Sequence, residues 1–306
     1  MSQLESELQT FDDEWALGDP IAIEARFREM LVKATADNHK SIYLQLLTQI
    51  ALASALQQKF NQAHETLDLA EQELTADHEL AAARVLLERG RVFHQADRLE
   101  EAKQFYRQAF DRGSAGEFDF LTIDAAHMLA IIGESVDEKI RWNRLAIELA
   151  KETDDQRAHR WMGSLSHNLG QFYFEAKRYD ESLLAYQEAL VYREQEAYEP
   201  NVRVAKWAIA RSLRYLGRDE ESLQILMELV ETYSTIAEAD HLDMPAAMLP
   251  LARGLVYEEL TEAFAAKASK YAALALDDLA KDPMFAKTEL IRLERLHQLK
   301  NWTAGN

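Results

Sequence analysis

The sequence predicts an all-α protein built from stacked pairs of helices, and two observations lead to this prediction. Only 10 glycines and 5 prolines occur among 306 residues, while residues that lose little conformational entropy in a helix are abundant. Small residues also recur along the chain, with successive steps of 39, 40, 40, 40 and 44 residues. They are Ala51, Gly90, Ala130, Gly170, Ala210 and Gly254. Self-similarity at such a period is typical of helical repeat arrays.

Further columns repeat in phase with these small residues. Three residues later come Ser54, Phe93, Gly133, Tyr173, Leu213 and Tyr257. Sixteen residues later, on a second helix, come Leu67, Tyr106, Tyr186 and Leu226. Because residues three or four apart share a helix face, each unit is expected to be two helices with one apolar stripe each. One hairpin cannot bury its stripe alone, so neighbouring hairpins are expected to stack into a continuous core.

The elements can be taken in order from the N-terminus. An apolar stripe at Leu4, Leu8, Phe11 and Trp15 predicts a first helix, which Gly18 ends. Its partner carries Ile23, Phe27 and Met30. Further repeats are expected to start near residues 44, 83, 123, 163, 203 and 247.

The C-terminal part of the chain is less regular. Pro245 and Pro250 lie before or within the helix that carries Gly254, so this helix is expected to start late or to kink. Residues 285–300 are expected to form a solvating cap helix, which an open solenoid end needs. No linker or low-complexity segment interrupts residues 1–306, which predicts a single solenoid domain.

The clearest hairpin resembles a known family. The pattern Leu169-Gly170-x-x-Tyr173, followed by Ser182-x-x-x-Tyr186-x-x-Ala189, is similar to the tetratricopeptide repeat. The resemblance covers residues 4 to 280, or six to seven units, and implies a right-handed α-solenoid. The period near 40 residues exceeds the usual ~34, and the proline that often ends the second helix is mostly absent. The chain therefore looks like a long-period variant.

Composition limits the classes of partner and chemistry. Without cysteine there is no disulfide, thiolate metal site or cysteine nucleophile. A formal charge of −19 disfavours nucleic acid and anionic membranes as partners. No secretory signal is visible at the start, and no apolar run reaches the ~20 residues that span a bilayer. We expect a cytoplasmic protein.

No catalytic motif accompanies the repeats. HExxH, GxSxG and glycine-rich phosphate loops are all absent. A single Glu-x-x-His pair, Glu294 with His297, lies on the expected cap helix without the second pair that di-metal bundles use. The sequence therefore predicts a non-enzymatic protein with no cofactor and no metal.

The family resemblance implies where a ligand would bind. In tetratricopeptide families part of the first helix faces a concave groove that holds peptides. His127, His167 and Trp207 would share one column of that groove wall, and Asn168 would match an asparagine that holds a ligand's backbone. Hydrogen-bonded structural roles are the alternative for the histidines.

Basic residues on the first helices predict the nature of the ligand. The helix from Arg203 to Tyr215 carries four bases and no acid, and the helix from Ala83 to Gln95 is also rich in arginine. A locally positive groove would favour an acidic segment or a carboxylate. Pairing of these arginines with acidic second helices of neighbouring repeats is the alternative. The predicted groove residues are Arg84, Arg91, His127, His167, Asn168, Gln171, Trp207, Arg211 and Arg214.

The function predicted from these residues is a protein–protein interaction module or adaptor. It would hold a peptide or protein segment, acidic or carboxylate-bearing, in its groove. The alternative is a peptide-sensing regulatory protein that acts in trans on a partner through closure of the superhelix.

Overall fold

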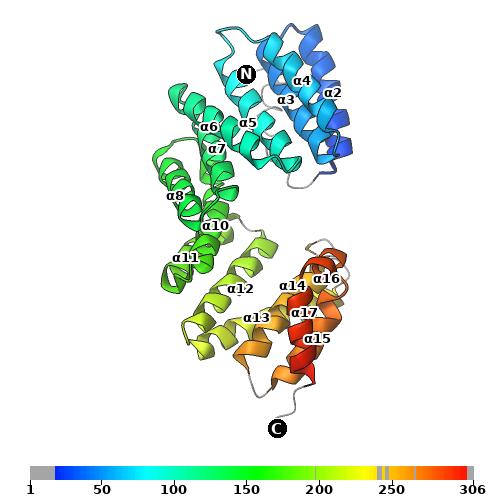
Figure 1. Ribbon diagram of the computed structural model, residues 1–306, viewed down its shortest axis with the longest axis vertical. Helices are drawn as coiled ribbons and strands as arrows, with labels where there is room; N and C mark the ends of the chain where they lie inside the picture. The colour runs from blue at the N-terminus through cyan, green and yellow to red at the C-terminus, as the bar shows by residue number, and fades with distance from the viewer. Residues whose placement is uncertain (1–17, 197, 240–242, 245–247, 265–266, 302–306) are drawn as a thin grey trace. The chain divides into compact units, whose positions relative to one another are not determined.

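The computed structural model describes residues 18–301 apart from 197, 240–242, 245–247 and 265–266. Every regular element in this part of the chain is a helix (Figure 1). The all-α prediction is confirmed there. The helix predicted around Leu4 to Trp15 lies outside the described residues. The chain divides into two compact units, residues 1–159 and 160–306, which are described separately below.

Unit 1 contains three helical hairpins that follow an opening helix. Its elements are α2 (Pro20–Ala36), α3 (Lys40–Leu56), α4 (Phe60–Gln72), α5 (Glu79–Gln95), α6 (Leu99–Ala115), α7 (Asp119–Ile131), α8 (Val136–Glu152) and the short α9 (Gln156–His159). The apolar face of α2 packs on α3, where Phe27 and Ile50 are fully buried. Beside them, Leu67 of α4 packs among alanines and Val92 of α5. Successive helices therefore bury their apolar faces against one another, as the repeat pattern predicts.

Unit 2 repeats this arrangement towards the C-terminus. Its elements are α10 (Met162–Glu175), α11 (Tyr179–Glu196), α12 (Glu199–Tyr215), α13 (Asp219–Glu238), α14 (Met248–Ala263), α15 (Ala268–Leu279), α16 (Pro283–Thr288) and α17 (Leu290–Lys300). Its largest core cluster joins Leu226 and Tyr233 of α13 to Leu260 of α14 and Leu279 of α15.

Close approach between paired helices explains the small-residue column. A Cβ added to Gly170 would lie 2.6 Å from the ring of Tyr186, and one added to Gly90 would lie 2.5 Å from the ring of Tyr106. Both tyrosines are buried. The ring of the second helix thus occupies the space that the missing side chain of the first helix leaves.

The serines twelve residues after the small column fasten the same hairpins. The hydroxyl of Ser182 donates to the carbonyl of Gly170 at 2.8 Å, and that of Ser222 donates to the carbonyl of Ala210 at 2.7 Å. Both hydroxyls are buried, so these bonds satisfy groups that would otherwise be costly to bury.

Several first helices end in the same backbone motif. After α10, Arg178 N–H donates to the carbonyl of Tyr173 and Lys177 N–H to that of Phe174, both at 2.9 Å. This pair of bonds is a Schellman motif, which needs a residue in the left-handed conformation. Lys177 takes that position with φ 59°, and Gly217 takes it after α12 with φ 73°. Most of these turns place a residue other than glycine in the left-handed position.

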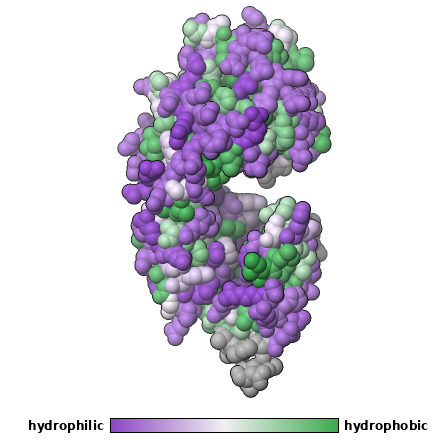
Figure 2. Space-filling view, viewed as in Figure 1, coloured by the Kyte–Doolittle hydropathy of each residue, from purple (hydrophilic) through white to green (hydrophobic). Residues whose placement is uncertain are grey.

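The C-terminal segment differs from the single cap helix expected over residues 285–300. The segment forms α16 and α17, with a break at Glu289, whose backbone (φ −108°, ψ 36°) leaves the helical region. Leu296 is buried, but Ile291 is 84% exposed and Leu290 and Met284 are exposed as well. Figure 2 shows hydrophobic residues gathered at the surface over α17. Pro250 lies in the first turn of α14, where proline is tolerated, whereas Pro245 lies outside the described residues.

Candidate functional site

In unit 1, the predicted groove arginine Arg91 is paired along the first helices. Its Nη1 donates to Glu88 Oε1 at 2.7 Å, and its Nη2 donates to both oxygens of Asp124 at 2.6 Å. Gln49 of α3 also donates to Glu88, at 3.3 Å. The resulting chain of polar contacts links α3, α5 and α7. Arg84 of α5 is buried beside it.

Burial and charge act together in this polar chain. Burial raises the pKa of the Glu88 carboxyl, even though Arg91 and Arg84 oppose that shift. The pKa of Arg91 lies well above its usual value, because Asp124 and Glu88 outweigh the opposing effect of its burial. The positive charge of Arg91 is therefore matched by buried carboxylates of first helices.

The two column-sharing histidines are enclosed by protein. Burial lowers the pKa of His127 to about 4. Burial, assisted by the charge of Arg193, lowers the pKa of His167 to about 4 as well. The His167 ring lies 5.1 Å from the ring of Tyr186. Both histidines are neutral at pH 7, so neither adds positive charge to a groove there.

In unit 2, the predicted residues of α10 and α12 lie around Tyr186. Gln171 accepts a hydrogen bond from the Tyr186 hydroxyl at 3.1 Å and donates to Glu175 at the same distance. Burial raises the pKa of Tyr186, while the nearby charge of Arg211 lowers it. Asn168 is half-buried, and its amide makes no hydrogen bond to the described residues.

Arginines and aromatic rings meet on α10, the start of α11 and α12. The guanidinium of Arg211 lies 4.2 Å from the ring centroid of Phe174 and 5.5 Å from that of Trp207. Arg214 lies 4.4 Å from the ring of Tyr215. Phe174 also contacts Tyr179 and Tyr215 at 5.2 and 4.9 Å. We call Phe174, Tyr179, Trp207, Arg211, Arg214 and Tyr215 the arginine–aromatic cluster.

The next first helix contributes a carboxylate to this cluster. Glu259 of α14 is buried and accepts a hydrogen bond from Arg214 Nε at 2.8 Å. Its other oxygen lies 3.3 Å from Arg211 Nε, which forms no hydrogen bond in the described part of the chain. Trp207 Nε1 donates to the carbonyl of Leu255, also on α14, at 3.4 Å. Contacts between first helices thus recur in both units.

Comparison with known families identifies the repeats. Two family models described as tetratricopeptide repeat match the chain, one over residues 83–112 and the other over residues 164–196. The chain carries tetratricopeptide repeats. These matches cover most of α5 and of α6, and most of α10 with all of α11.

Solved structures agree with this fold. Apo RapI is similar over 93% of this chain and 75% of its own, with a TM-score of 0.66. BtubC (BKLC) from P. vanneervenii is similar over 74% of this chain and 94% of its own, with a TM-score of 0.60. A tetratricopeptide repeat protein fragment from Cytophaga hutchinsonii gives a TM-score of 0.55, covering 86% and 94%. Each is 14% identical, so the likeness concerns the fold. No curated protein matches the sequence.

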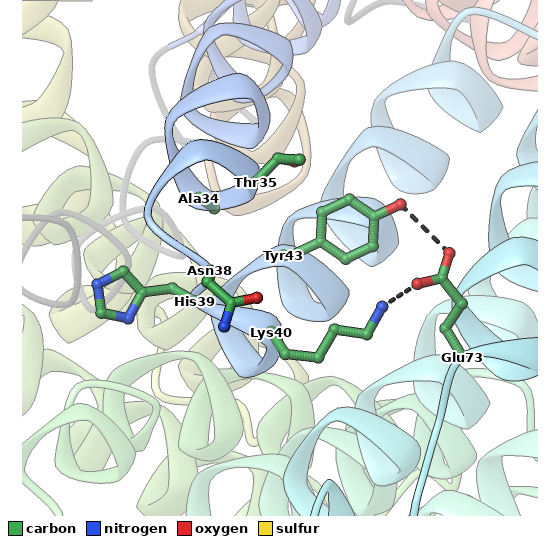
Figure 3. Close-up of a pocket in the computed structure, with 7 residues that line it drawn as sticks. All are labelled: Ala34, Thr35, Asn38, His39, Lys40, Tyr43 and Glu73. Carbon is green, nitrogen blue, oxygen red and sulfur yellow. Dashed lines mark hydrogen bonds and ion pairs between the residues drawn. The ribbon is translucent and has the colours of Figure 1, made fainter.

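A small pocket lies in unit 1 among α2, α3 and the end of α4 of the tetratricopeptide array (Figure 3). It encloses about 220 Å³ and is lined by Ala34, Thr35, Asn38, His39, Lys40, Tyr43 and Glu73. Lys40 forms an ion pair with Glu73, and its ammonium lies 4.6 Å from the centroid of the Tyr43 ring. The opposite charges of Lys40 and Glu73 in the pocket therefore neutralise each other. Small-molecule pockets usually enclose ~300–1,000 Å³. This pocket is smaller than that range.

Metal-ligand clusters and membrane-spanning helices are both missing from the part of the chain that the structure describes. These residues contain no group of three or more histidines, aspartates and glutamates arranged to hold a metal ion. Among the described helices, none has the length and apolar character to cross a membrane.

Sequence reasoning missed the acids that face the groove arginines. It looked for carboxylates on second helices, and Arg89 does pair with Asp68 and Glu71 of the second helix α4. Arg91 and Arg214, however, pair with acids on first helices. Acids within the first-helix segments are the signal that could have revealed these partners.

Proposed function

We propose that this protein is a non-enzymatic interaction module, an adaptor, that binds an acidic or carboxylate-bearing peptide or protein segment along its first helices. One observation carries the proposal. Arg211 is 29% exposed and lies near two aromatic rings, and its Nε forms a 3.3 Å ion pair with Glu259 but no hydrogen bond within the described chain. A guanidinium has five N–H donors in a planar fork that fits a carboxylate. Arg211 therefore has donors to offer a ligand.

The side chains around Arg211 suit a binding site. Tryptophan, tyrosine and arginine are the residue types that dominate binding energy at protein interfaces. Tyr215 is 44% exposed and stands beside Arg214, whose donors are shared with Glu259. Rings that already hold the arginine side chain reduce the conformational entropy that binding would cost.

The proposed binding surface includes all nine groove residues that the sequence predicts. In unit 2, the amide of Asn168 is free to bind a ligand. Gln171 accepts a hydrogen bond from Tyr186, and the ring of His167 packs against the ring of Tyr186. In unit 1, Arg91 would exchange its contact with Asp124 for a ligand carboxylate. We place Arg84, Arg91, His127, His167, Asn168, Gln171, Trp207, Arg211 and Arg214 on this surface and Arg211 at its centre.

The test is a binding measurement with acidic pentapeptides. Fluorescence anisotropy would be recorded for a library with free C-terminal carboxylates and for the amidated counterparts. Arg211→Gln should weaken the tightest free-acid peptide by roughly tenfold, because a hydrogen bond to a charged group is lost. Arg218→Gln is the matched control, since Arg218 carries the same charge on a turn of unit 2, where it pairs with Glu221. Equal weakening by both substitutions would refute the site.

The alternative adds movement to the same binding event. A peptide-sensing regulator would change the arrangement of its repeats when the peptide binds and so act in trans on a partner. X-ray scattering with and without the bound peptide separates the two: a smaller radius of gyration supports the sensor, and an unchanged one supports the adaptor.

We place the protein in the cytoplasm, as one solenoid domain over residues 1–306, without a cofactor or metal. The charge of −19 supports exclusion of nucleic acid and anionic membranes. Binding to DNA or to anionic vesicles at physiological salt would contradict this exclusion.

A further inference from the structure

Glu259 occupies an unusual position in the arginine–aromatic cluster. It is a buried carboxylate on α14 that faces two arginines of α12. Its Oε2 accepts the hydrogen bond from Arg214, while its Oε1 points to Arg211. The place that a ligand carboxylate would take beside Arg211 is therefore already next to an internal carboxylate.

Arg214 makes a closer contact with Glu259 than Arg211 does. The contact with Arg214 is a hydrogen bond of 2.8 Å, whereas the contact with Arg211 is an ion pair of 3.3 Å without a hydrogen bond. The Arg211 guanidinium also lies 4.2 Å from the ring centroid of Phe174 and 5.5 Å from that of Trp207. Arg211 can thus turn to a ligand while Arg214 keeps the buried carboxylate paired.

We infer that Glu259 is a built-in competitor of the ligand, a residue that sets how strongly Arg211 binds a carboxylate. This inference rests on the proposed function. With one acid and two arginines, the cluster offers a single excess positive charge, which suits one carboxylate rather than several. The rings around Arg211 favour a carboxylate attached to an apolar or aromatic group.

Other charged groups near Glu259 are few in the described residues. Glu258 precedes it and pairs with Arg292 of α17. His167 packs against the ring of Tyr186 and is neutral at pH 7. Burial raises the pKa of Glu259, against the opposing effect of Arg214 and Arg211. On acidification Glu259 is therefore expected to lose its charge above the usual ~3.3–3.7 of a peptide C-terminus.

The test compares two adjacent glutamates. N-acetylphenylalanine and its amide serve as probes, and the Nε–H resonance of Arg211 is followed by NMR during titration. Glu259→Gln keeps a hydrogen-bond acceptor for Arg214 but removes the competing charge, so it should tighten binding of the free acid roughly tenfold. Glu258→Gln removes the same charge one residue away and should change binding less than twofold. The amide should respond to neither substitution.

The pH dependence gives a second readout. In the wild type, affinity for the free acid should rise on acidification while the probe's own carboxylate is still charged, since burial raises the pKa of Glu259. In Glu259→Gln this rise should be absent.

The titrations distinguish a competing role of Glu259 from a positioning role. If Glu259→Gln weakens binding, or tightens it no more than Glu258→Gln does, Glu259 positions the arginines and the competitor idea is wrong. In that case loss of binding in Arg211→Gln would still uphold the proposed function. If the probe shifts Arg211 in neither wild type nor Glu259→Gln, the inference is overturned. The anisotropy measurements with the peptide library then test the proposed function independently of this inference.

Discussion

Single residues of the first helices decide what their faces can bind. Arg91 and Arg211 occupy the same column, one residue after the small position, yet their surroundings differ. Arg91 is hydrogen-bonded to two buried acids, whereas Arg211 lies against Phe174 and Trp207 and has only a 3.3 Å ion pair with Glu259, in which its Nε forms no hydrogen bond. Charge-assisted hydrogen bonds from Nη1 to Glu88 and from Nη2 to both oxygens of Asp124 occupy both terminal nitrogens of Arg91. Column membership alone therefore does not make an arginine available to a ligand.

His167 makes the stability of the protein sensitive to acid. Its pKa is lowered to about 4 in the folded protein, against about 6.5 in an unfolded chain. Because the fold favours the neutral ring, its contribution is complete above pH 6.5 and is lost as the pH falls through 6.5 towards 4. A shift of this size is worth on the order of 3 kcal/mol. His167→Gln should reduce the loss of unfolding free energy between pH 7 and pH 4 by up to that amount.

Urea denaturation at several pH values measures the effect of His167. His297 on α17 is exposed, and His297→Gln serves as the control that should keep the wild-type pH dependence. An unaltered pH profile in His167→Gln would mean that the histidine is already solvated in the folded protein.

At the scale of elements, the hairpins show how far the sequence could predict the fold. The small column and its partner tyrosines were readable because close packing needs particular residue sizes, as Gly170 and Tyr186 illustrate. The break at Glu289 was not readable, because the apolar spacing continues across it. The partners of Arg91 and Arg214 were missed because contacts between neighbouring repeats depend on helix stacking, which local patterns do not encode.

The turns after the first helices allow a matched pair of substitutions. Lys177 and Gly217 occupy equivalent left-handed positions, and only glycine adopts that conformation without a steric cost. Lys177→Gly should raise the unfolding free energy by about 1 kcal/mol, and Gly217→Ala should lower it by about 1 kcal/mol. A Cβ at Gly217 would meet no atom within 4 Å, so its effect reports on the backbone alone. Changes of the same sign in the two variants, measured by urea denaturation, would contradict this account.

At the scale of the whole molecule, the large net negative charge affects the stability of the fold. With 53 acidic and 34 basic residues, the chain carries −19, and self-repulsion opposes its compact state. The Debye length falls from ~30 Å at 0.01 M salt to ~10 Å at 0.1 M, which screens repulsion between distant charges. Exposed ion pairs contribute only ~0–1 kcal/mol each, and buried pairs such as Arg91 with Asp124 are screened little. We therefore expect salt to weaken the repulsion more than it weakens the ion pairs.

Salt should consequently stabilise the protein. The unfolding free energy, measured by urea denaturation, is expected to rise when sodium chloride increases from ~0.01 to ~0.15 M. Replacing three exposed acids, Glu65, Asp77 and Glu228, by lysine should raise stability at low salt and flatten the salt dependence. The matched replacement by glutamine should have about half that effect, because each site then changes by one unit charge instead of two. If salt lowers the stability instead, the ion pairs between helices outweigh the repulsion between like charges.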